Sequence, residues 1–71
     1  MRKYRINKNT YTNPGGHNEV HDQYCQHYDR LSNYEYLGEH PHCFSAVAAA
    51  RARGYDKADG CKGCSKPCNR G

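Results

Sequence analysis

The sequence has very few large apolar side chains. Outside Met1, six residues are large aliphatics or phenylalanine: Ile6, Val20, Leu31, Leu37, Phe44 and Val47. With 71 residues, the chain has the length of one small domain, a size at which even an ordinary hydrophobic core gives marginal stability. This composition excludes a hydrophobic core that stabilises the domain on its own. We therefore expect a metal ion or a covalent cross-link to supply the rest of the stability.

Segments that direct a chain to membranes or out of the cell are also missing. No apolar segment follows the basic start Met1-Arg2-Lys3-Tyr4, and no apolar run is long enough to cross a bilayer. We therefore expect a cytoplasmic protein that does not bind membranes. In a reducing cytoplasm, clustered cysteines indicate a metal site more often than disulfides. The count of five cysteines also leaves one unpaired if all the others form disulfides.

Motifs typical of enzymes are missing as well. The chain has no phosphate-binding loop, no pair of catalytic carboxylates and no recognisable nucleophile with a neighbouring base. We therefore expect no enzymatic activity.

What the sequence does contain is two pairs of metal ligands. His21 and Cys25 form a His-x3-Cys pair, and Cys61 and Cys64 form a Cys-x2-Cys pair near the C-terminus. Three thiolates and one imidazole make a closed tetrahedral zinc site, and such sites are structural. We predict that these four residues bind one zinc ion. Binding of structural zinc contributes on the order of 10 kcal/mol in small peptides, comparable to the stability of a whole domain.

Other cysteines and histidines leave alternatives open. His27, Cys43 and Cys68 are alternative ligands. Cys43 is also a candidate for a small core residue, and Cys68 for a disulfide partner of Cys43 or an unpaired thiol. A second hypothesis is a thiol redox protein, or a disulfide-stabilised one, that uses the four cysteines Cys43, Cys61, Cys64 and Cys68. Redox Cys-x2-Cys motifs of thioredoxin type follow a strand and begin a helix, whereas this motif follows a helix and enters an irregular tail.

Hydrophobic periodicity predicts a small α+β domain that spans residues 1–71. Alternation over Lys3–Lys8 and over His17–His21 predicts two strands of a β-hairpin, joined through the turn residues Asn13-Pro14-Gly15-Gly16. One or two helical turns are expected within residues 24–31, and a third strand within residues 33–38. Together these segments predict a three-stranded antiparallel sheet.

The clearest predicted element is a helix from about Pro41 to Arg53 that ends at Gly54. Its buried stripe is expected to include Cys43, Val47 and Ala50. The Cys-x2-Cys knuckle follows the helix in an irregular tail. We expect residues 1–2 and 69–71 to be disordered.

Charge is unevenly distributed along the chain. The formal net charge is +4, and both ends are basic while the middle is acidic. This balance gives only slight support to a nucleic-acid partner, and a protein partner stays equally open; we expect a monomeric module. The candidate contacts are Arg2, Lys3, Arg5, Lys62 and Lys66. The seven tyrosines have two interpretations, as stacking partners for bases or as the core of an apolar-poor chain.

The order of these features resembles the Ada metal-binding domain family, a group of small bacterial zinc modules. The resemblance spans residues 20–64 and rests on His21-x3-Cys25, the alanine-rich helix that ends at Gly54-Tyr55, and Cys61-x2-Cys64. It implies a zinc-stabilised fold with His21, Cys25, Cys61 and Cys64 as ligands.

Two departures from the family pattern limit what the resemblance implies. In the alkylation-response protein of this family, the first cysteine of the x3 pair also accepts methyl groups from DNA phosphotriesters. Here His21 occupies that position, so no methyl-acceptor activity is expected. The connection between Gly54 and Cys61 is also longer than in the family, and Cys43 and Cys68 have no family counterpart.

Overall fold

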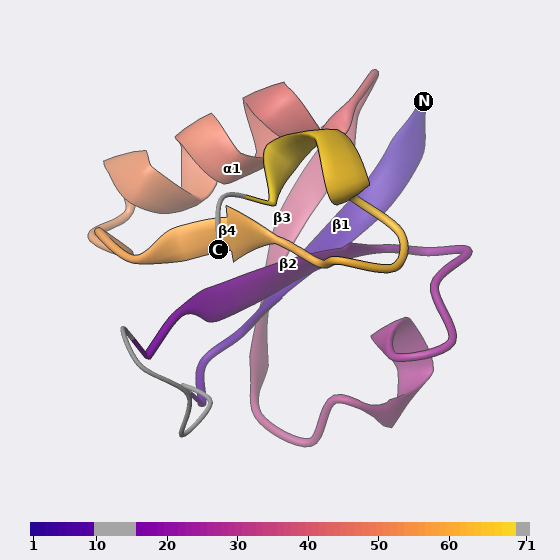
Figure 1. Ribbon diagram of the computed structural model, residues 1–71, viewed down its shortest axis with the longest axis horizontal. Helices are drawn as coiled ribbons and strands as arrows, with labels where there is room; N and C mark the ends of the chain where they lie inside the picture. Colours follow the sequence, from indigo (N-terminus) through magenta and orange to yellow (C-terminus); the bar gives the residue numbers. More distant parts are fainter. Residues whose placement is uncertain (10–15, 70–71) are drawn as a thin grey trace.

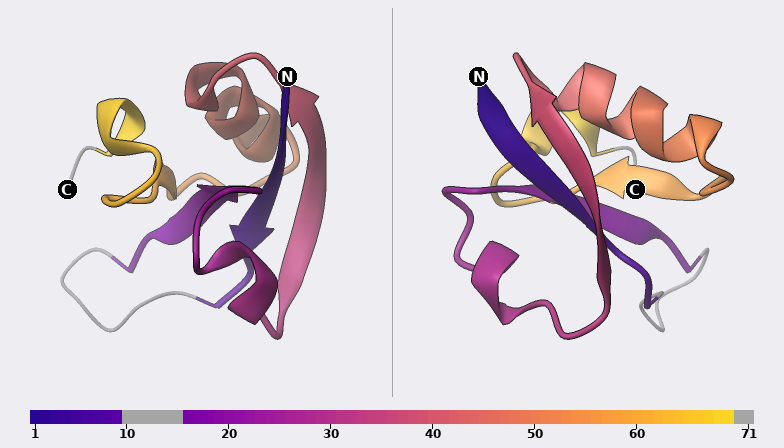
Figure 2. Two further views of the ribbon diagram at one scale, coloured as in Figure 1. Left: turned by 90° about the vertical axis from the view of Figure 1, so that its right-hand side faces the viewer. Right: turned by 180° about the vertical axis from the view of Figure 1, so that it is seen from behind.

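The computed structural model describes residues 1–9 and 16–69 (Figure 1). Its elements are, in chain order, strand β1 (Arg2–Asn7), strand β2 (Asn18–Asp22), the 3-10 turn η1 (Tyr28–Arg30), strand β3 (Tyr34–His40), helix α1 (Cys43–Ala52), strand β4 (Ala58–Gly60) and the 3-10 turn η2 (Lys66–Cys68). The four strands form one sheet in the order β3-β1-β2-β4. Helix α1 packs on one face of this sheet, and η2 lies beside it (Figure 2).

The α+β class is confirmed, but the predicted number and direction of the strands are wrong. β1 pairs antiparallel with both β2 and β3, as expected. The missed fourth strand, β4, pairs parallel with β2, with Asn18 opposite Ala58 and Val20 opposite Gly60. The three residues of β4 show no apolar alternation, so the sequence did not predict this strand. Pairing with β2 holds it in place, together with the hydrogen bond from the backbone N–H of Asn18 to the Lys57 carbonyl (3.1 Å).

The core lies between the sheet and α1. Tyr4, Ile6, Val20 and Leu37 are buried there and are at most 3% exposed. Because side chains alternate along a strand, Arg5 and His21 lie on the opposite face, where they are paired across β1 and β2. The core interpretation holds for Tyr4 and Tyr28, which are buried, whereas Tyr24, Tyr34 and Tyr36 are exposed.

Helix α1 is shorter at its start than predicted. The helix begins at Cys43 rather than Pro41, because His42 is the N-cap residue and its Nδ1 accepts a hydrogen bond from the backbone N–H of Ser45 at 3.4 Å. The predicted stop is confirmed, since Gly54 has a φ of 102° immediately after the C-cap residue Arg53. The predicted buried stripe is also confirmed and gains Ala46.

The remaining expectations concern the loops and the chain ends. The segment 24–31 forms only the single 3-10 turn η1, and Cys25 precedes it. Arg2 belongs to β1, and Asn69 donates a side-chain hydrogen bond to the Gly60 carbonyl at 3.0 Å. Most of the turn predicted at 13–16, and the terminal residues 70–71, lie outside the described residues. Within the described part of the chain, no helix has the length and apolar character that a membrane crossing requires.

Candidate metal centre

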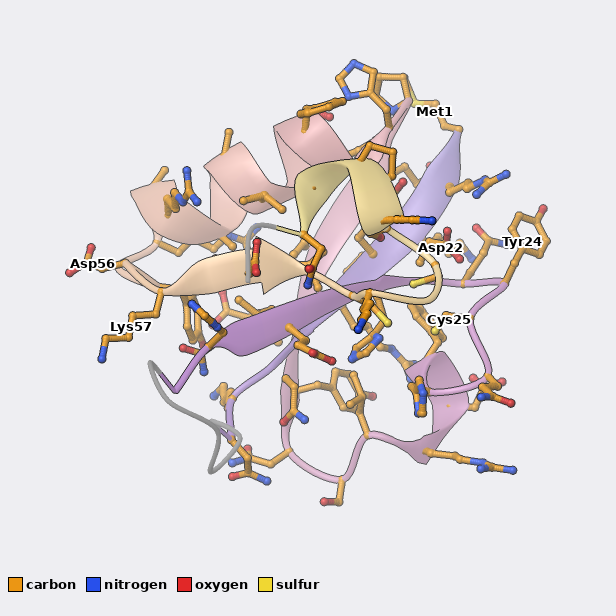
Figure 3. The ribbon with its side chains drawn as sticks, viewed as in Figure 1. Met1, Asp22, Tyr24, Cys25, Asp56 and Lys57 are labelled. Carbon is orange, nitrogen blue, oxygen red and sulfur yellow. A yellow bond between two sulfur atoms is a disulfide. The ribbon has the colours of Figure 1, made fainter. Side chains whose placement is uncertain are left out.

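A tight turn after β2 brings the first pair of predicted ligands together. Asp22 ends the strand, and its Oδ1 accepts a hydrogen bond from the backbone N–H of Tyr24 at 2.9 Å, an Asx-type turn. The backbone N–H of Cys25 also donates to the Asp22 carbonyl at 3.0 Å. The chain therefore reverses, and the Cys25 Sγ atom lies 3.6 Å from Nδ1 of His21. Figure 3 shows Cys25 below the turn, with Tyr24 directed away from the molecule.

The second pair of ligands is attached to the same end of β2. The backbone N–H of Cys61 donates to the Val20 carbonyl at 3.0 Å and so extends the pairing of β4 with β2. The backbone N–H of Ser65 donates to the Cys61 carbonyl at 2.8 Å and closes the knuckle between them. The missed strand β4 thus positions the Cys-x2-Cys motif beside His21.

The four predicted ligand residues form one cluster. The sulfur atoms of Cys25, Cys61 and Cys64 and a ring nitrogen of His21 all lie within 4.8 Å of one another. Ligand atoms of a tetrahedral zinc ion, at about 2.0 to 2.3 Å from the metal, are separated by roughly 3.3 to 3.8 Å. Small side-chain movements therefore suffice to close the site around an ion.

Burial divides the cluster into an inner and an outer half. His21 is 0% and Cys61 4% exposed, whereas Cys25 and Cys64 are half-buried. Burial lowers the pKa of His21 to about 4, and the neighbouring His27 adds to this effect. The imidazole is therefore neutral at physiological pH, as a metal ligand must be.

The thiol groups of the outer half are shifted in the opposite sense. Burial raises the pKa of the Cys64 thiol to about 12, and it also raises the pKa of Cys25. Backbone hydrogen bonds from Asp22 to Cys64 and from His27 to Cys25 act against these shifts. Without a cation both groups remain protonated thiols, and a bound metal would provide the charge that converts them to thiolates.

The environment of His21 fits a metal ligand better than an ordinary buried histidine. Its Nδ1 faces the Cys25 sulfur, while its buried Nε2 makes no hydrogen bond among the described residues. The Glu19 carboxylate lies 3.8 Å from Nε2, at the distance of an ion pair. Histidine ligands of metals commonly direct their second ring nitrogen to a carboxylate, which fixes the ring orientation. Metal bound at Nδ1 would leave the proton on Nε2, facing Glu19.

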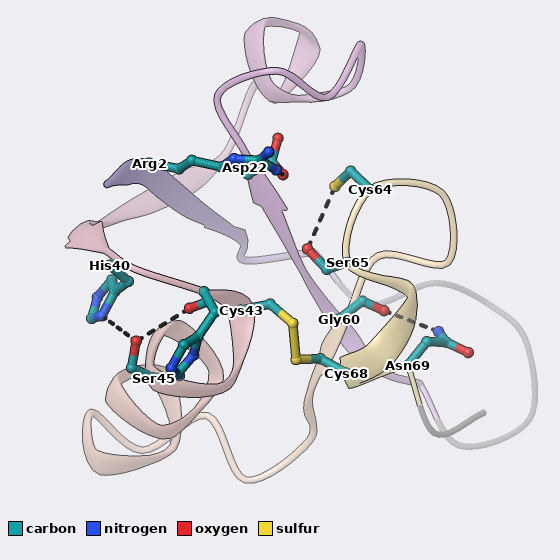
Figure 4. The surroundings of a disulfide bond; sticks show 11 residues. Arg2, Asp22, His40, Cys43, Ser45, Gly60, Cys64, Ser65, Cys68 and Asn69 are labelled. Carbon is teal, nitrogen blue, oxygen red and sulfur yellow. Dashed lines mark hydrogen bonds and ion pairs between the residues drawn. A yellow bond between two sulfur atoms is a disulfide. The ribbon is translucent and has the colours of Figure 1, made fainter.

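The alternative ligands lie outside this cluster. Cys43 and Cys68 form a disulfide between α1 and η2, so neither is a metal ligand (Figure 4). Of the roles left open for Cys68, disulfide partner of Cys43 is the one observed. His27 is exposed, and its ring centroid is 5.5 Å from that of His21. The structure thus gathers the four first-choice residues and none of the substitutes.

The five basic residues predicted to contact nucleic acid have different surroundings. Arg5 lies between the rings of Tyr28 and Tyr34, at 4.0 and 4.1 Å from their centroids, and donates to the Tyr28 carbonyl. It therefore holds the η1 segment to the sheet. Arg2 forms a 3.0 Å ion pair with Asp22 and lies over the Tyr24 ring. The lysines of this set are exposed: Lys3, Lys62 and Lys66.

Three residues that position the site were missed by sequence reasoning: Glu19, Asp22 and Ser65. Asp22 had a readable signal, because an aspartate two residues before a turn N–H is typical of an Asx turn. Glu19 lies two residues before His21, and residues at this spacing share one face of a strand, so it too was accessible to prediction. Ser65 carried no such signal.

Comparisons with models of known families, with curated proteins and with solved structures give no significant match to this chain. The resemblance to the Ada family therefore stays a prediction that rests on the sequence motifs alone.

Proposed function

We propose that this chain is a small zinc-stabilised binding module, of the kind that the resemblance to the Ada metal-binding family implies. The observation that carries the proposal is the convergence of His21, Cys25, Cys61 and Cys64 from two distant segments to within 4.8 Å. A donor set of three sulfurs and one nitrogen favours zinc over magnesium or calcium, which take oxygen ligands. All four positions of a tetrahedral ion are filled by protein, so the bound metal has a structural role.

Zinc would join β2 to the C-terminal knuckle. The apolar core consists of few residues, and among the described residues after Gly54, up to residue 69, regular structure is limited to β4 and the short turn η2. A metal bound by ligands some forty residues apart closes a long loop. Bringing the ends of such a loop together costs conformational entropy, and metal binding would offset this cost. The same proposal assigns no methyl-acceptor activity to the site, because His21 stands at the acceptor position and is fully buried.

Native mass spectrometry of protein refolded with one equivalent of zinc tests the proposal. One zinc ion per chain is expected for the wild type. Cys61→Ser and His21→Ala should lose the ion in the presence of a competing chelator, whereas His27→Ala, a neighbouring histidine outside the cluster, should keep it. Equal retention of zinc by His21→Ala and His27→Ala would contradict the proposed ligand set.

For the partner, we propose a nucleic acid whose phosphates contact the surface near the metal centre. Lys3 is exposed and its backbone is hydrogen-bonded to Gln23, directly after β2, while Lys62 lies inside the knuckle. The Tyr24 ring is 72% exposed beside Arg2, which offers a base a stacking surface next to cationic side chains. Together these residues form a small basic surface with one aromatic ring, next to the metal centre.

Titration of single-stranded DNA and RNA at two salt concentrations tests the partner. Counterion release predicts that the apparent affinity falls steeply with salt, and that loss of one phosphate contact lowers the salt slope by about one. Lys3→Ala and Lys62→Ala should each do this. Lys57→Ala is the matched control, since Lys57 is exposed at the opposite end of the molecule from Cys25 (Figure 3). Absence of binding at low salt would leave a protein partner as the alternative.

A second candidate function, a disulfide-stabilised small protein, is favoured by the Cys43–Cys68 bond. The Cys43–Cys68 disulfide and the proposed zinc ligands use different cysteines, so both cross-links fit within one molecule. Thiol titration tests both: the unfolded, unreduced protein should contain three free thiols rather than five, and addition of zinc to the native protein should strongly decrease the reactivity of its thiols.

A further inference from the structure

The outer half of the metal centre borders an open hollow in the surface. The hollow has a volume of about 370 Å³ and is lined by Tyr24, Cys25, Gln26, His27, Gly63 and Cys64. Its two sulfur-bearing residues are the half-buried pair of the cluster. Cys61 is 4% exposed and does not line the hollow. The hollow therefore gives small solutes access to Cys25 and Cys64 but not to Cys61.

We propose that Cys25 and Cys64 are a site of reversible oxidation by hydroperoxides, at which formation of a Cys25–Cys64 disulfide releases the bound metal. This inference rests on the proposed zinc site and assigns different roles to its cysteines. Cys61 and His21 are buried and do not react, whereas Cys25 and Cys64 react because they line the hollow.

The reaction proceeds in two steps. One thiolate of the pair attacks the terminal oxygen of the hydroperoxide, so that an S–O bond forms, the O–O bond breaks and the alcohol or water leaves after taking up a proton. The second thiolate attacks the resulting sulfenic acid, forming the S–S bond and releasing water with a second proton. Two electrons pass from two sulfurs to one peroxide. A zinc ion held by the cluster would then keep only Cys61 and His21 as protein ligands and would dissociate.

The two sulfur atoms need only a short movement to form the disulfide. The two sulfur atoms already lie within 4.8 Å of each other, and a disulfide requires about 2.05 Å. Both residues sit in turns rather than in strands, where the backbone adjusts most easily. The Cys43–Cys68 bond is already oxidised and so is inert toward peroxide. It keeps η2 attached to α1 after the metal has left, so reduction can restore the site.

Peptide mapping of the peroxide-treated protein tests this assignment. Trypsin cleavage after Lys62 separates Cys61 from Cys64, so the two sulfurs are distinguishable by mass. Treatment of the zinc-loaded protein with one equivalent of hydrogen peroxide should release one zinc ion, link the Cys25 and Cys64 peptides, and leave Cys61 open to a thiol label. Addition of a thiol reductant and zinc should reverse the change. A Cys61 disulfide as the main product would overturn the proposal.

Two additional experiments test the oxidation site separately from zinc binding. Metal-free protein presents the same pair of cysteines and, at alkaline pH where thiolates form, should give the same Cys25–Cys64 link. If the chain binds no zinc, the proposed function fails while this arm still decides the pairing. Replacement of Gly63 by leucine narrows the hollow and should slow oxidation by tert-butyl hydroperoxide at least about tenfold, with zinc content unchanged. An unchanged rate would show that the hollow is not the route.

Discussion

Gly60 is the position where a single methyl group should most disturb the link between the sheet and the metal centre. It ends β4 directly before Cys61 and is buried. A Cβ atom added at Gly60 would lie 2.5 Å from the Ser65 carbonyl oxygen, 2.6 Å from Cys68 Cβ and 2.9 Å from the Cys68 carbonyl carbon. Two of these atoms belong to the backbone of the turn that follows the knuckle, and the third is fixed by the disulfide.

Gly60→Ala therefore forces η2 away from β4. Overpacking of this kind costs about 1 to 3 kcal/mol, and three simultaneous clashes favour the upper end. The displacement also weakens the hydrogen bond from the Ser65 N–H to Cys61 that closes the knuckle. We expect a loss of about 3 kcal/mol in the free energy of unfolding, a large fraction of the stability of a small domain.

Urea unfolding of the zinc-loaded protein, followed by circular dichroism, measures this loss. Gly63→Ala is the matched control on the same knuckle, since a Cβ atom there meets only the Cys61 Sγ atom at 3.9 Å, an ordinary contact. The control should change the stability by less than about 0.5 kcal/mol. If the two variants unfold at the same urea concentration, the packing of η2 against Gly60 is not what positions the knuckle.

Three other measurements address separate parts of the site. Calorimetry in buffers of different ionisation enthalpy should find about three protons released per zinc bound at pH 6, because His21, with a pKa of about 4, is already neutral; close to four would mean an ordinary histidine. Glu19→Ala should lower zinc affinity about 10- to 100-fold, with the exposed Glu39→Ala as control, and equal affinities would exclude Glu19 as the partner of Nε2. Loss of the Cys43–Cys68 disulfide, which closes a separation of 25 residues, should cost about 3.5 kcal/mol in the chain-entropy treatment, and an unchanged urea midpoint for the Cys43→Ala/Cys68→Ala double variant would contradict that.

The ligand cluster was more predictable than the fold. The chemistry of His-x3-Cys and Cys-x2-Cys depends on spacing, which is local, and the four first-choice residues do come together. Helix α1 and the β1–β2 hairpin were predicted for the same reason, since alternation, alanine content and a terminal glycine are local signals. The ends of these elements shifted by one or two residues, and the start of α1 shifted because His42 caps the helix through its side chain.

Strand β4 and the disulfide depend on contacts between distant segments. Ala58, Asp59 and Gly60 have little strand propensity, and they form a strand because β2 offers an unpaired edge. The pairing of Cys43 with Cys68 follows from the approach of η2 to α1, which no periodicity encodes. Arg5 likewise appeared to be a surface cation, but its guanidinium lies between two tyrosine rings contributed by residues far along the chain.

X-ray absorption at the zinc edge of the purified, zinc-reconstituted protein tests the metal centre most directly. Coordination by Cys25, Cys61, Cys64 and His21 predicts three sulfur neighbours at about 2.3 Å and one nitrogen at about 2.0 Å. A first shell made mainly of oxygen and nitrogen, or a protein that remains folded without taking up zinc, would contradict a zinc-stabilised module.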